Sequence, residues 1–258
     1  MTLSGVNVDD ERVRAERVDG RLIAPPLPRL DPRQELALLA RLLHREGYDD
    51  HLAGHITYRQ QDGTFLVNPF GLTWSQVCAS DIMRMDADGH LLDGAWTISP
   101  AVQLHVELHR ARDVVVAVHN HPEWGTLWAD LGRVPEIHDQ TGALYHGGVA
   151  VCSEYAGPVN RPENARTVVA AMGDANVCLL AHHGVLFVAD DVEQAYLRGM
   201  AFEWRCRQAW RVECAGGAEP MDPRVAATYG DRYNTRHFTG LFAAMARDVL
   251  RADPNVLE

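Results

Sequence analysis

Hydrophobic positions recur with the period of an α-helix in several separate parts of the chain, beginning at Asp31. Asp31 is a favourable N-cap, Pro32 suits the first helical position, and Gln34 completes a capping box. Gly47 ends the segment, whose apolar face consists of Leu36, Leu39, Leu42 and Leu43. The same period predicts further helices over residues 102–112, 164–174, 191–214 and 241–250.

Short apolar runs of strand character lie between these helices. They read HITYR, TFLVNP, IMRMD and HLLDG in the first hundred or so residues, then VVVAVHNH, GGVAVCSEY, VCLLAHHG and VLFVA. Turn signals such as QDG separate neighbouring runs and favour hairpins. Because helices and strands alternate without an internal repeat, the chain from Asp31 onward is interpreted as one mixed α and β domain.

The pattern divides the chain into three regions. Residues 1–30 carry mixed charge and the segment APPLPRL without a sustained apolar period, which is typical of an N-terminal arm. Residues 31–217 form the predicted main domain, closed by a Gly-Gly pair after its longest helix. Residues 218–258 form a C-terminal extension with a helix that packs on this domain or on a neighbouring subunit.

Composition excludes some classes of function. A net charge of −11 over 258 residues argues against a nucleic-acid partner, because phosphates would be repelled over most of the surface. No window reaches the roughly 18 apolar residues of a membrane span, and the N-terminus lacks the apolar region of a signal peptide, so no membrane partner is expected. The five dispersed cysteines indicate reduced thiols and a cytoplasmic protein. Histidine is unusually frequent, with 13 copies.

Two of these histidines lie at the end of the run VVVAVHNH. Side chains alternate along a strand, so His119 and His121 point to one face and Asn120 to the other. Pro122 lacks a backbone donor and is expected to end the strand. Two imidazoles at an open strand end can hold a metal ion if a third ligand arrives, but they can equally be a pair of surface histidines.

The run VCLLAHHG also delivers histidines to its end. If it pairs beside the first run, either His182 or His183 meets His119 and His121. Three neutral imidazoles leave coordination positions for water or substrate, which is typical of a catalytic rather than a structural metal site.

These residues resemble the class II aldolase and adducin-head family, which includes fuculose-phosphate aldolase and ribulose-phosphate 4-epimerase. The resemblance covers roughly residues 31–214 and rests on AGHITYR, FLVNPFGL, the helix before VHNH, the HNH motif and LLAHHGVL. It implies an α/β three-layer sandwich, with a central, mostly antiparallel sheet and helices on both faces. It also implies a homotetramer with active sites between subunits and a small-molecule substrate.

The resemblance assigns the third metal ligand as well. In the family the histidine directly before the glycine is the ligand, so His183 is expected to join His119 and His121, with His182 as a neighbour. One divalent ion per subunit is implied, with zinc favoured over manganese, iron or cobalt.

The chain departs from the aldolases of this family just before the helix predicted at 102–112. There the family carries an acid/base glutamate in a Ser-Ser-Glu motif, whereas this chain reads Ser99, Pro100 and Ala101. Alanine cannot transfer a proton, and a placed acid or base contributes roughly 10²–10⁴ in rate. In this respect the chain resembles the adducin-like branch, where alanine commonly stands at this position.

The positions that resemble the family's phosphate pocket are altered too. Three hydrogen-bonding side chains are replaced, and no Walker-type glycine loop compensates. The expected substrate-binding residues are Gly54, Phe70, Gly71 and Ser99. A small unphosphorylated carbonyl or carboxylate substrate, aromatic or branched, is therefore expected in place of a sugar phosphate.

Four residues are candidates for the missing acid or base. Glu123 follows the HNH motif and is either a base, a fourth ligand or a solvated charge. His55 replaces a ligand-binding asparagine of the family. His138 and Asp139 lie near the place where the family presents residues across a subunit interface; otherwise they are ordinary polar loop residues.

His105 and His109 are four residues apart on one predicted helix, with Glu107 between them. This spacing imitates a metal-binding pattern. The signal is weak, because the family helix often carries a histidine that only packs.

Three functions compete. The first is a divalent-metal carbon–carbon lyase acting by retro-aldol cleavage or decarboxylation, and decarboxylation suits Ala101 because release of CO2 needs no base to start it. The second is a three-histidine non-haem iron oxygenase on the same scaffold. The third is a non-catalytic adducin-like assembly domain, which is disfavoured because adducin heads lose the metal histidines that this chain keeps.

Overall fold

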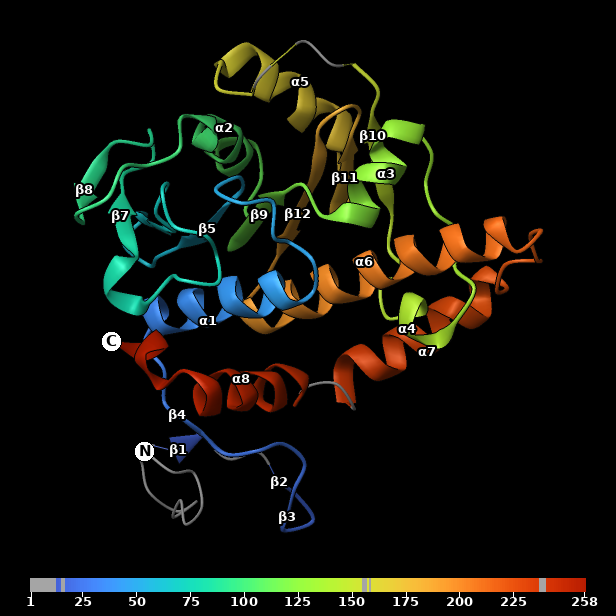
Figure 1. Ribbon diagram of the computed structural model, residues 1–258, viewed down its shortest axis with the longest axis horizontal. Helices are drawn as coiled ribbons and strands as arrows, with labels where there is room; N and C mark the ends of the chain where they lie inside the picture. The colour runs from blue at the N-terminus through green and yellow to red at the C-terminus, as the bar shows by residue number, and fades with distance from the viewer. Residues whose placement is uncertain (1–12, 15–16, 155–156, 158, 237–239) are drawn as a thin grey trace.

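The computed structural model describes residues 13–14, 17–154, 157, 159–236 and 240–258 (Figure 1). The helices are α1 (Pro32–Arg45), α2 (Gln103–Ala111), α3 (Glu123–Leu131), α4 (Gln140–Ala143), α5 (Pro162–Met172), α6 (Val192–Cys214), α7 (Pro223–Arg236) and α8 (Leu241–Ala252), with 3₁₀ turns η1 (Ala79–Asp81), η2 (Pro100–Val102) and η3 (Pro254–Leu257). The strands are β1 (Val13–Arg14), β2 (Arg17–Val18), β3 (Arg21–Leu22), β4 (Leu27–Pro28), β5 (His55–Arg59), β6 (Phe65–Val67), β7 (Met83–Met85), β8 (Leu91–Asp93), β9 (Val116–Asn120), β10 (Val149–Cys152), β11 (Val177–Leu180) and β12 (Gly184–Ala189).

An eight-stranded sheet in the order β10-β11-β12-β9-β5-β6-β7-β8 forms the middle layer. Only β10 and β11 run parallel, and the other neighbouring pairs of this sheet are antiparallel. The mostly antiparallel sheet expected from the sequence is confirmed. Strand β9 lies near the centre, where its two neighbours place Leu186 and His55 directly opposite His119.

Helices cover both faces of the sheet, which confirms the three-layer architecture (Figure 1). Helices α2 and α5 pack together on one face, and α1, α3 and α6 lie on the other. Because side chains alternate along β9, Val116 and Val118 join the larger apolar core under α1 and α6, while Ala117 joins the smaller core under α2 and α5. His119 follows Ala117 in this alternation and therefore faces the α2 side.

The capping box predicted for the first helix is present. The Asp31 carboxylate accepts hydrogen bonds from the backbone N–H groups of Arg33 and Gln34, at 2.8 and 3.0 Å. The Gln34 side-chain oxygen in turn accepts from the Asp31 backbone N–H at 3.1 Å. Gly47 has φ +96°, a conformation that suits glycine after a helix. The helices predicted over 102–112, 164–174, 191–214 and 241–250 are also present, with ends shifted by up to two residues.

Helices α3, α4 and α7 escaped the sequence analysis. The N-cap residue of α3 is Pro122, whose side chain cannot accept a hydrogen bond, and the helix contains Gly125. α4 is a single turn, too short for a period. α7 contains Gly230, and few of its described side chains are buried.

The C-terminal turn η3 lies beside α1 (Figure 1). Strands β1 and β4 of the arm pair with each other, and Leu27 is buried, whereas residues 1–12 lie outside the described part. Helix α8 packs on α1 and α6, and η3 packs on α1. The region limits at 30 and 217 remain predictions. Among the described residues, no helix is both long and apolar enough to cross a membrane.

Candidate metal centre

Three imidazoles converge at the end of β9. The ring centroids of His119 and His183 are 4.7 Å apart, those of His121 and His183 4.9 Å, and those of His119 and His121 5.1 Å. One ring nitrogen from each residue lies within 4.8 Å of the other two. Sequence reasoning predicted these three residues as ligands, and the fold brings them together.

The backbone decides which of the two adjacent histidines faces the cluster. His182 and His183 lie in the turn between β11 and β12, closed by a hydrogen bond from the His183 N–H to the Leu180 carbonyl at 3.0 Å. His182 has φ +55°, in the left-handed region, which sends its ring outward. Its side chain is 70% exposed and lies 3.8 Å from the Asp130 carboxylate. His183 turns inward to the other two rings.

Hydrogen bonds fix the orientation of two of the rings. His119 Nδ1 lies 3.0 Å from the Val185 carbonyl oxygen, and His121 Nδ1 lies 2.7 Å from Asp50 Oδ2. Both oxygens can only accept, so each Nδ1 carries the hydrogen and each Nε2 keeps its lone pair. A metal-ligating histidine typically donates its other N–H in this way.

The cluster fits a divalent metal ion. His121 Nε2 is buried and finds no hydrogen-bond partner among the described residues, as expected of an atom aimed at an ion. Burial lowers the pKa of His119 well below its usual range and that of His183 to about 4, so both rings are neutral near pH 7. Neutral imidazole is the ligating form, and three nitrogen ligands suit zinc, iron or a similar transition metal.

Gly184 allows β12 to approach the HNH motif closely. A Cβ atom at this position would lie 2.6 Å from the His121 ring and 2.6 Å from the Asn120 carbonyl oxygen. The close packing of β12 on the HNH motif therefore requires glycine at position 184, directly after His183.

Gly184→Ala is expected to displace the His121 ring, destabilise the protein by about 1–3 kcal/mol through overpacking, and weaken metal binding. Gly148→Ala is the matched control, because nothing lies within 4 Å of a Cβ at that position. Denaturant unfolding and metal titration of both variants check this. Equal behaviour of the two variants would show that β12 tolerates a side chain here.

His55 lies directly opposite His119 and is buried, with its ring centroid 5.2 Å from that of His119. Burial, together with His183 and His121 nearby, lowers the pKa of His55 to about 3. Its Nε2 has no hydrogen-bond partner in the part of the chain that the structure describes. Of the four candidate acid/base residues, His55 thus lies against the metal cluster.

His105 and His109 do not join the cluster. Both bond the hydroxyl of Thr57 on β5, His105 through Nδ1 at 2.9 Å and His109 through Nε2 at 2.8 Å. A hydroxyl has one hydrogen, so it donates to one ring and accepts from the other. The two histidines are thus buried packing residues of α2. The ring centroid of His105 nevertheless lies 4.2 Å from that of His55.

The other acid/base candidates lie in different surroundings. Glu123 is the exposed first residue of α3 and lines a cavity of about 230 Å³ that has none of the three clustered histidines in its wall. The Asp139 carboxylate caps α4 through the Gly142 N–H at 2.7 Å and accepts from Trp204 Nε1 at 2.9 Å. His138 is half-buried beside it. Catalytic roles for these residues remain predictions.

The residues expected to bind substrate lie in two segments. Gly54 has φ +89° and precedes His55, and a Cβ there would lie 2.3 Å from the Asn120 amide. Phe70 is 42% exposed, and its N–H donates to the Thr97 carbonyl at 2.9 Å, so Phe70 and Gly71 run beside the segment that leads to Ser99. The Ser99 hydroxyl accepts from the Ala101 N–H at 3.3 Å, and Ala101 packs on the core under α2.

Glu203 of α6 is a residue that sequence reasoning missed. Its carboxylate accepts hydrogen bonds from the backbone N–H groups of Trp124 and Gly125, each at 2.8 Å, and so caps α3 directly after the HNH motif. Glu203 is only 5% exposed, and burial raises its pKa to about 7, against the lowering effect of the two N–H groups. No local pattern reveals it, because cap and helix lie some eighty residues apart.

The pKa of Glu203 predicts a pH-dependent stability. The pKa of Glu203 in the folded protein, about 7, exceeds the ordinary value of 4.5. The contribution of this shift to the free energy of unfolding is therefore fully present below pH 4.5 and is lost as the pH rises through 7. Relative to Glu203→Gln, wild type should lose about 3 kcal/mol of unfolding free energy over this window. Chemical unfolding of both proteins at several pH values checks this, and a constant difference across the window would contradict it.

The chain is similar in sequence and in structure to known proteins. The family model described as Class II Aldolase and Adducin N-terminal domain matches residues 34–210. The 3,4-dihydroxyphthalate decarboxylase of Arthrobacter keyseri is 34% identical over 211 residues, which cover 75% of this chain and 83% of that protein. The 4-hydroxy-3-prenylphenylpyruvate oxygenase/4-hydroxy-3-prenylbenzoate synthase of Streptomyces roseochromogenus subsp. oscitans is 28% identical over 210 residues, covering 79% of this chain and 76% of that protein. The crystal structure of an aldolase II superfamily protein from Pseudomonas syringae superimposes with a TM-score of 0.75 and 27% identity, covering 88% of this chain and 97% of that one.

Proposed function

Because this chain belongs to the family of class II aldolase and adducin N-terminal domains, we propose that it is a divalent-metal-dependent carbon–carbon lyase. Its substrate is a small unphosphorylated carboxylate or carbonyl compound, and decarboxylation is favoured over retro-aldol cleavage. The observation that carries the proposal is the convergence of three imidazoles, with one ring nitrogen of each within 4.8 Å of the others and with Nδ1 of His119 and of His121 hydrogen-bonded away from the centre.

His119, His121 and His183 would hold the metal ion. When bound there, such an ion supplies positive charge against the negative charge that develops on the substrate as the carbon–carbon bond breaks, worth several kcal/mol. Val185 and Asp50 keep two of the rings oriented. Zinc is the preferred ion, and manganese, iron and cobalt are the alternatives.

Ala101 favours decarboxylation. An aldolase of this family would place its glutamate there, and the structure offers only a methyl group packed on the core. Loss of CO2 needs no base to begin it, but the carbon left behind must then take up a proton. His55 is the preferred donor, through the N–H of its neutral ring, because it is buried against the cluster with an unpartnered Nε2. Glu123, His138 and Asp139 are the remaining candidates.

An aromatic carboxylate is the preferred substrate class. The decarboxylase relative is named for 3,4-dihydroxyphthalate, a hydroxylated aromatic dicarboxylate. In this chain the exposed Phe70 stands where the family has a phosphate-binding threonine, so it provides a flat apolar surface instead of a hydroxyl. A ring system packs on such a surface, whereas a phosphate does not.

The test is a panel of hydroxylated aromatic carboxylates, hydroxy acids and keto acids, assayed without oxygen. Release of CO2, or of an aldehyde fragment, from at least one class is expected. A full panel that yields neither product from metal-loaded protein would contradict the lyase proposal.

An iron oxygenase is the second candidate. It is favoured by the oxygenase relative and by a three-histidine ligand set that leaves positions open. The same panel separates the two, since turnover only with ferrous iron and O2 would favour the oxygenase. A protein that never retains metal, even after reconstitution, would instead favour a non-catalytic adducin-like domain.

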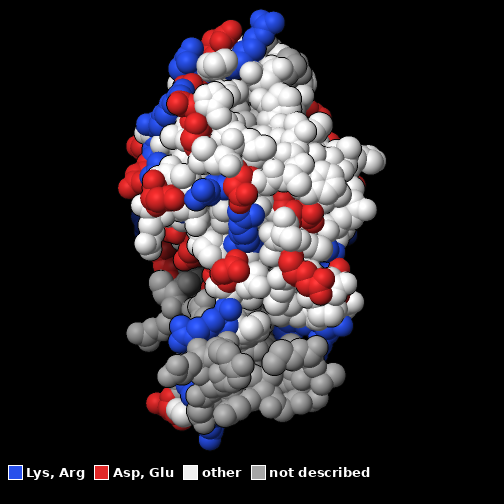
Figure 2. All heavy atoms as spheres, turned by 90° about the vertical axis from the view of Figure 1, so that its left-hand side faces the viewer, with Lys and Arg blue, Asp and Glu red and all other residues white. Residues whose placement is uncertain are grey.

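We expect a homo-oligomer, preferably a tetramer with active sites between subunits. The free edge of the sheet at β8 carries exposed Leu91 and Leu92, 46% and 50% accessible, and Figure 2 shows a broad area without charged side chains on the side of the molecule where β8 lies. Neighbouring exposed leucines in a surface area without charged side chains mark a candidate subunit contact. Sedimentation at micromolar concentration checks this, and a monomer of 28.7 kDa would contradict it.

A further inference from the structure

We propose that Asp50 is a positioning residue of the metal centre and that it sets the affinity of the site for its ion. The inference rests on the metal centre of the proposed function. It assigns a role to a loop, residues 46–54, that contributes no ligand of its own.

The Asp50 carboxylate is held between two imidazoles. Its Oδ2 lies 2.7 Å from Nδ1 of His121, and its Oδ1 lies 3.0 Å from Nδ1 of His51. An ionised carboxylate only accepts hydrogen bonds, so it forces the hydrogen of the His121 ring onto Nδ1. The lone pair of Nε2, which has no partner among the described residues, is then left for the ion.

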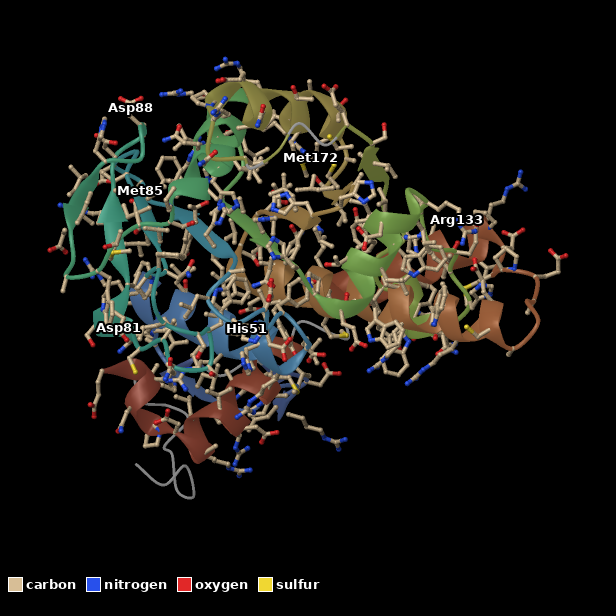
Figure 3. All side chains as sticks on the ribbon, turned by 45° about the horizontal axis from the view of Figure 1, so that its top comes forward. His51, Asp81, Met85, Asp88, Arg133 and Met172 are labelled. Atoms are coloured by element: carbon tan, nitrogen blue, oxygen red, sulfur yellow. The ribbon has the colours of Figure 1, made fainter. Side chains whose placement is uncertain are left out.

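The loop is anchored on both sides of Asp50. Before it, Tyr48 is fully buried, and its hydroxyl donates to the Gly199 carbonyl of α6 at 3.0 Å. After it, the Ala53 carbonyl accepts from the Asn120 amide at 3.2 Å. Figure 3 labels His51 on this loop near the middle of the molecule. These contacts, which do not involve the metal, thus hold Asp50 at the end of β9.

The two oriented ligands differ in what orients them. His119 is held by the backbone carbonyl of Val185, which no side-chain substitution removes. His121 depends on a side chain that is 39% exposed, so its ion pair adds little to the stability of the fold. A structural role and a positioning role therefore predict different results, since only the second changes metal affinity while leaving apoprotein stability nearly unchanged.

The experiment compares wild type with Asp50→Asn and Asp50→Ala in the full chain. Asn can turn either its carbonyl or its amide toward Nδ1, and Ala removes the acceptor altogether. Asp49→Asn is the matched control, because Asp49 is an exposed neighbour on the same loop. Zn²⁺ affinity is measured by competition with a chromogenic chelator, and the apoprotein's unfolding midpoint and histidine ¹⁵N chemical shifts are recorded.

Both Asp50 variants are expected to bind Zn²⁺ about 10- to 100-fold more weakly than wild type. The ¹⁵N shifts should show His121 moving from the Nδ1–H form to a mixture of tautomers, with the unfolding midpoint and the Asp49→Asn affinity unchanged. Wild-type affinity in both Asp50 variants would overturn the inference while leaving the metal centre intact. A wild-type protein that binds no Zn²⁺ would instead overturn the metal centre itself, so the two failures are distinguishable.

Discussion

Replacing His119, His121 or His183 by alanine is expected to leave well below one metal ion per chain and to remove the activity. Each ring supplies one of three nitrogen ligands within 4.8 Å of one another, and a site reduced to two ligands holds a divalent ion poorly. Loss of several kcal/mol of charge stabilisation corresponds to a rate decrease of roughly 10²- to 10⁴-fold. Metal content of the purified variants, measured per chain, checks the expectation.

His182→Ala is the matched control for His183→Ala. The His182 side chain is 70% exposed and points toward Asp130, so this variant should keep its metal and its activity. If His183→Ala kept full metal while His182→Ala lost it, the assignment within the adjacent pair would be reversed.

Phosphorylated sugars are expected not to be turned over efficiently, even after the missing carboxylate is restored by Ala101→Glu. By its resemblance to the family, the chain is expected to carry His55, Phe70 and Pro100 in place of the side chains that would hold a phosphate. Binding energy from a remote phosphate is normally used to lower the barrier at the reacting carbon, and this chain lacks that contact. A restored acid or base, worth roughly 10²–10⁴ in rate, does not replace it.

Wild type and Ala101→Glu are assayed against fuculose- and ribulose-type phosphates, beside unphosphorylated hydroxy acids and keto acids. Efficient cleavage of the phosphates by wild type would make the protein an ordinary aldolase with a relocated base. Glu123 would then be the first residue to substitute.

Local patterns predicted the elements whose causes are local. The capping box of α1 needs only Asp31, Pro32 and Gln34, and strand β9 ends at Asn120, just before His121 and Pro122. The cluster of His119, His121 and His183 could also be predicted from the sequence, because two of the residues lie at the end of one strand and a family resemblance selected the third.

The supports of the cluster were not predictable in the same way. Asp50 reaches His121 from a loop seventy-one residues earlier, and Glu203 caps α3 from seventy-eight residues later. Such contacts depend on how layers pack, and a single sequence carries no period or cap signal for them. For the same reason α3 was missed, since its cap comes from another helix.

The side chain of His182 points into solvent because of the backbone conformation of this residue. Residue type and spacing do not distinguish two adjacent histidines after an apolar strand, and in the structure the left-handed φ of +55° at His182 separates them. Its consequence is that one ring is solvated while the next completes the cluster.

The most direct test of a metal-dependent lyase is the titration of metal-free protein with Zn²⁺ under nitrogen, followed by release of CO2 from a hydroxylated aromatic carboxylate. We expect no release without the ion and a rate that rises until one equivalent per chain is bound. Asp50→Asn should need more Zn²⁺ to reach its plateau, and His183→Ala should stay inactive throughout. Release of CO2 at an undiminished rate by the metal-free protein would contradict a metal-dependent lyase.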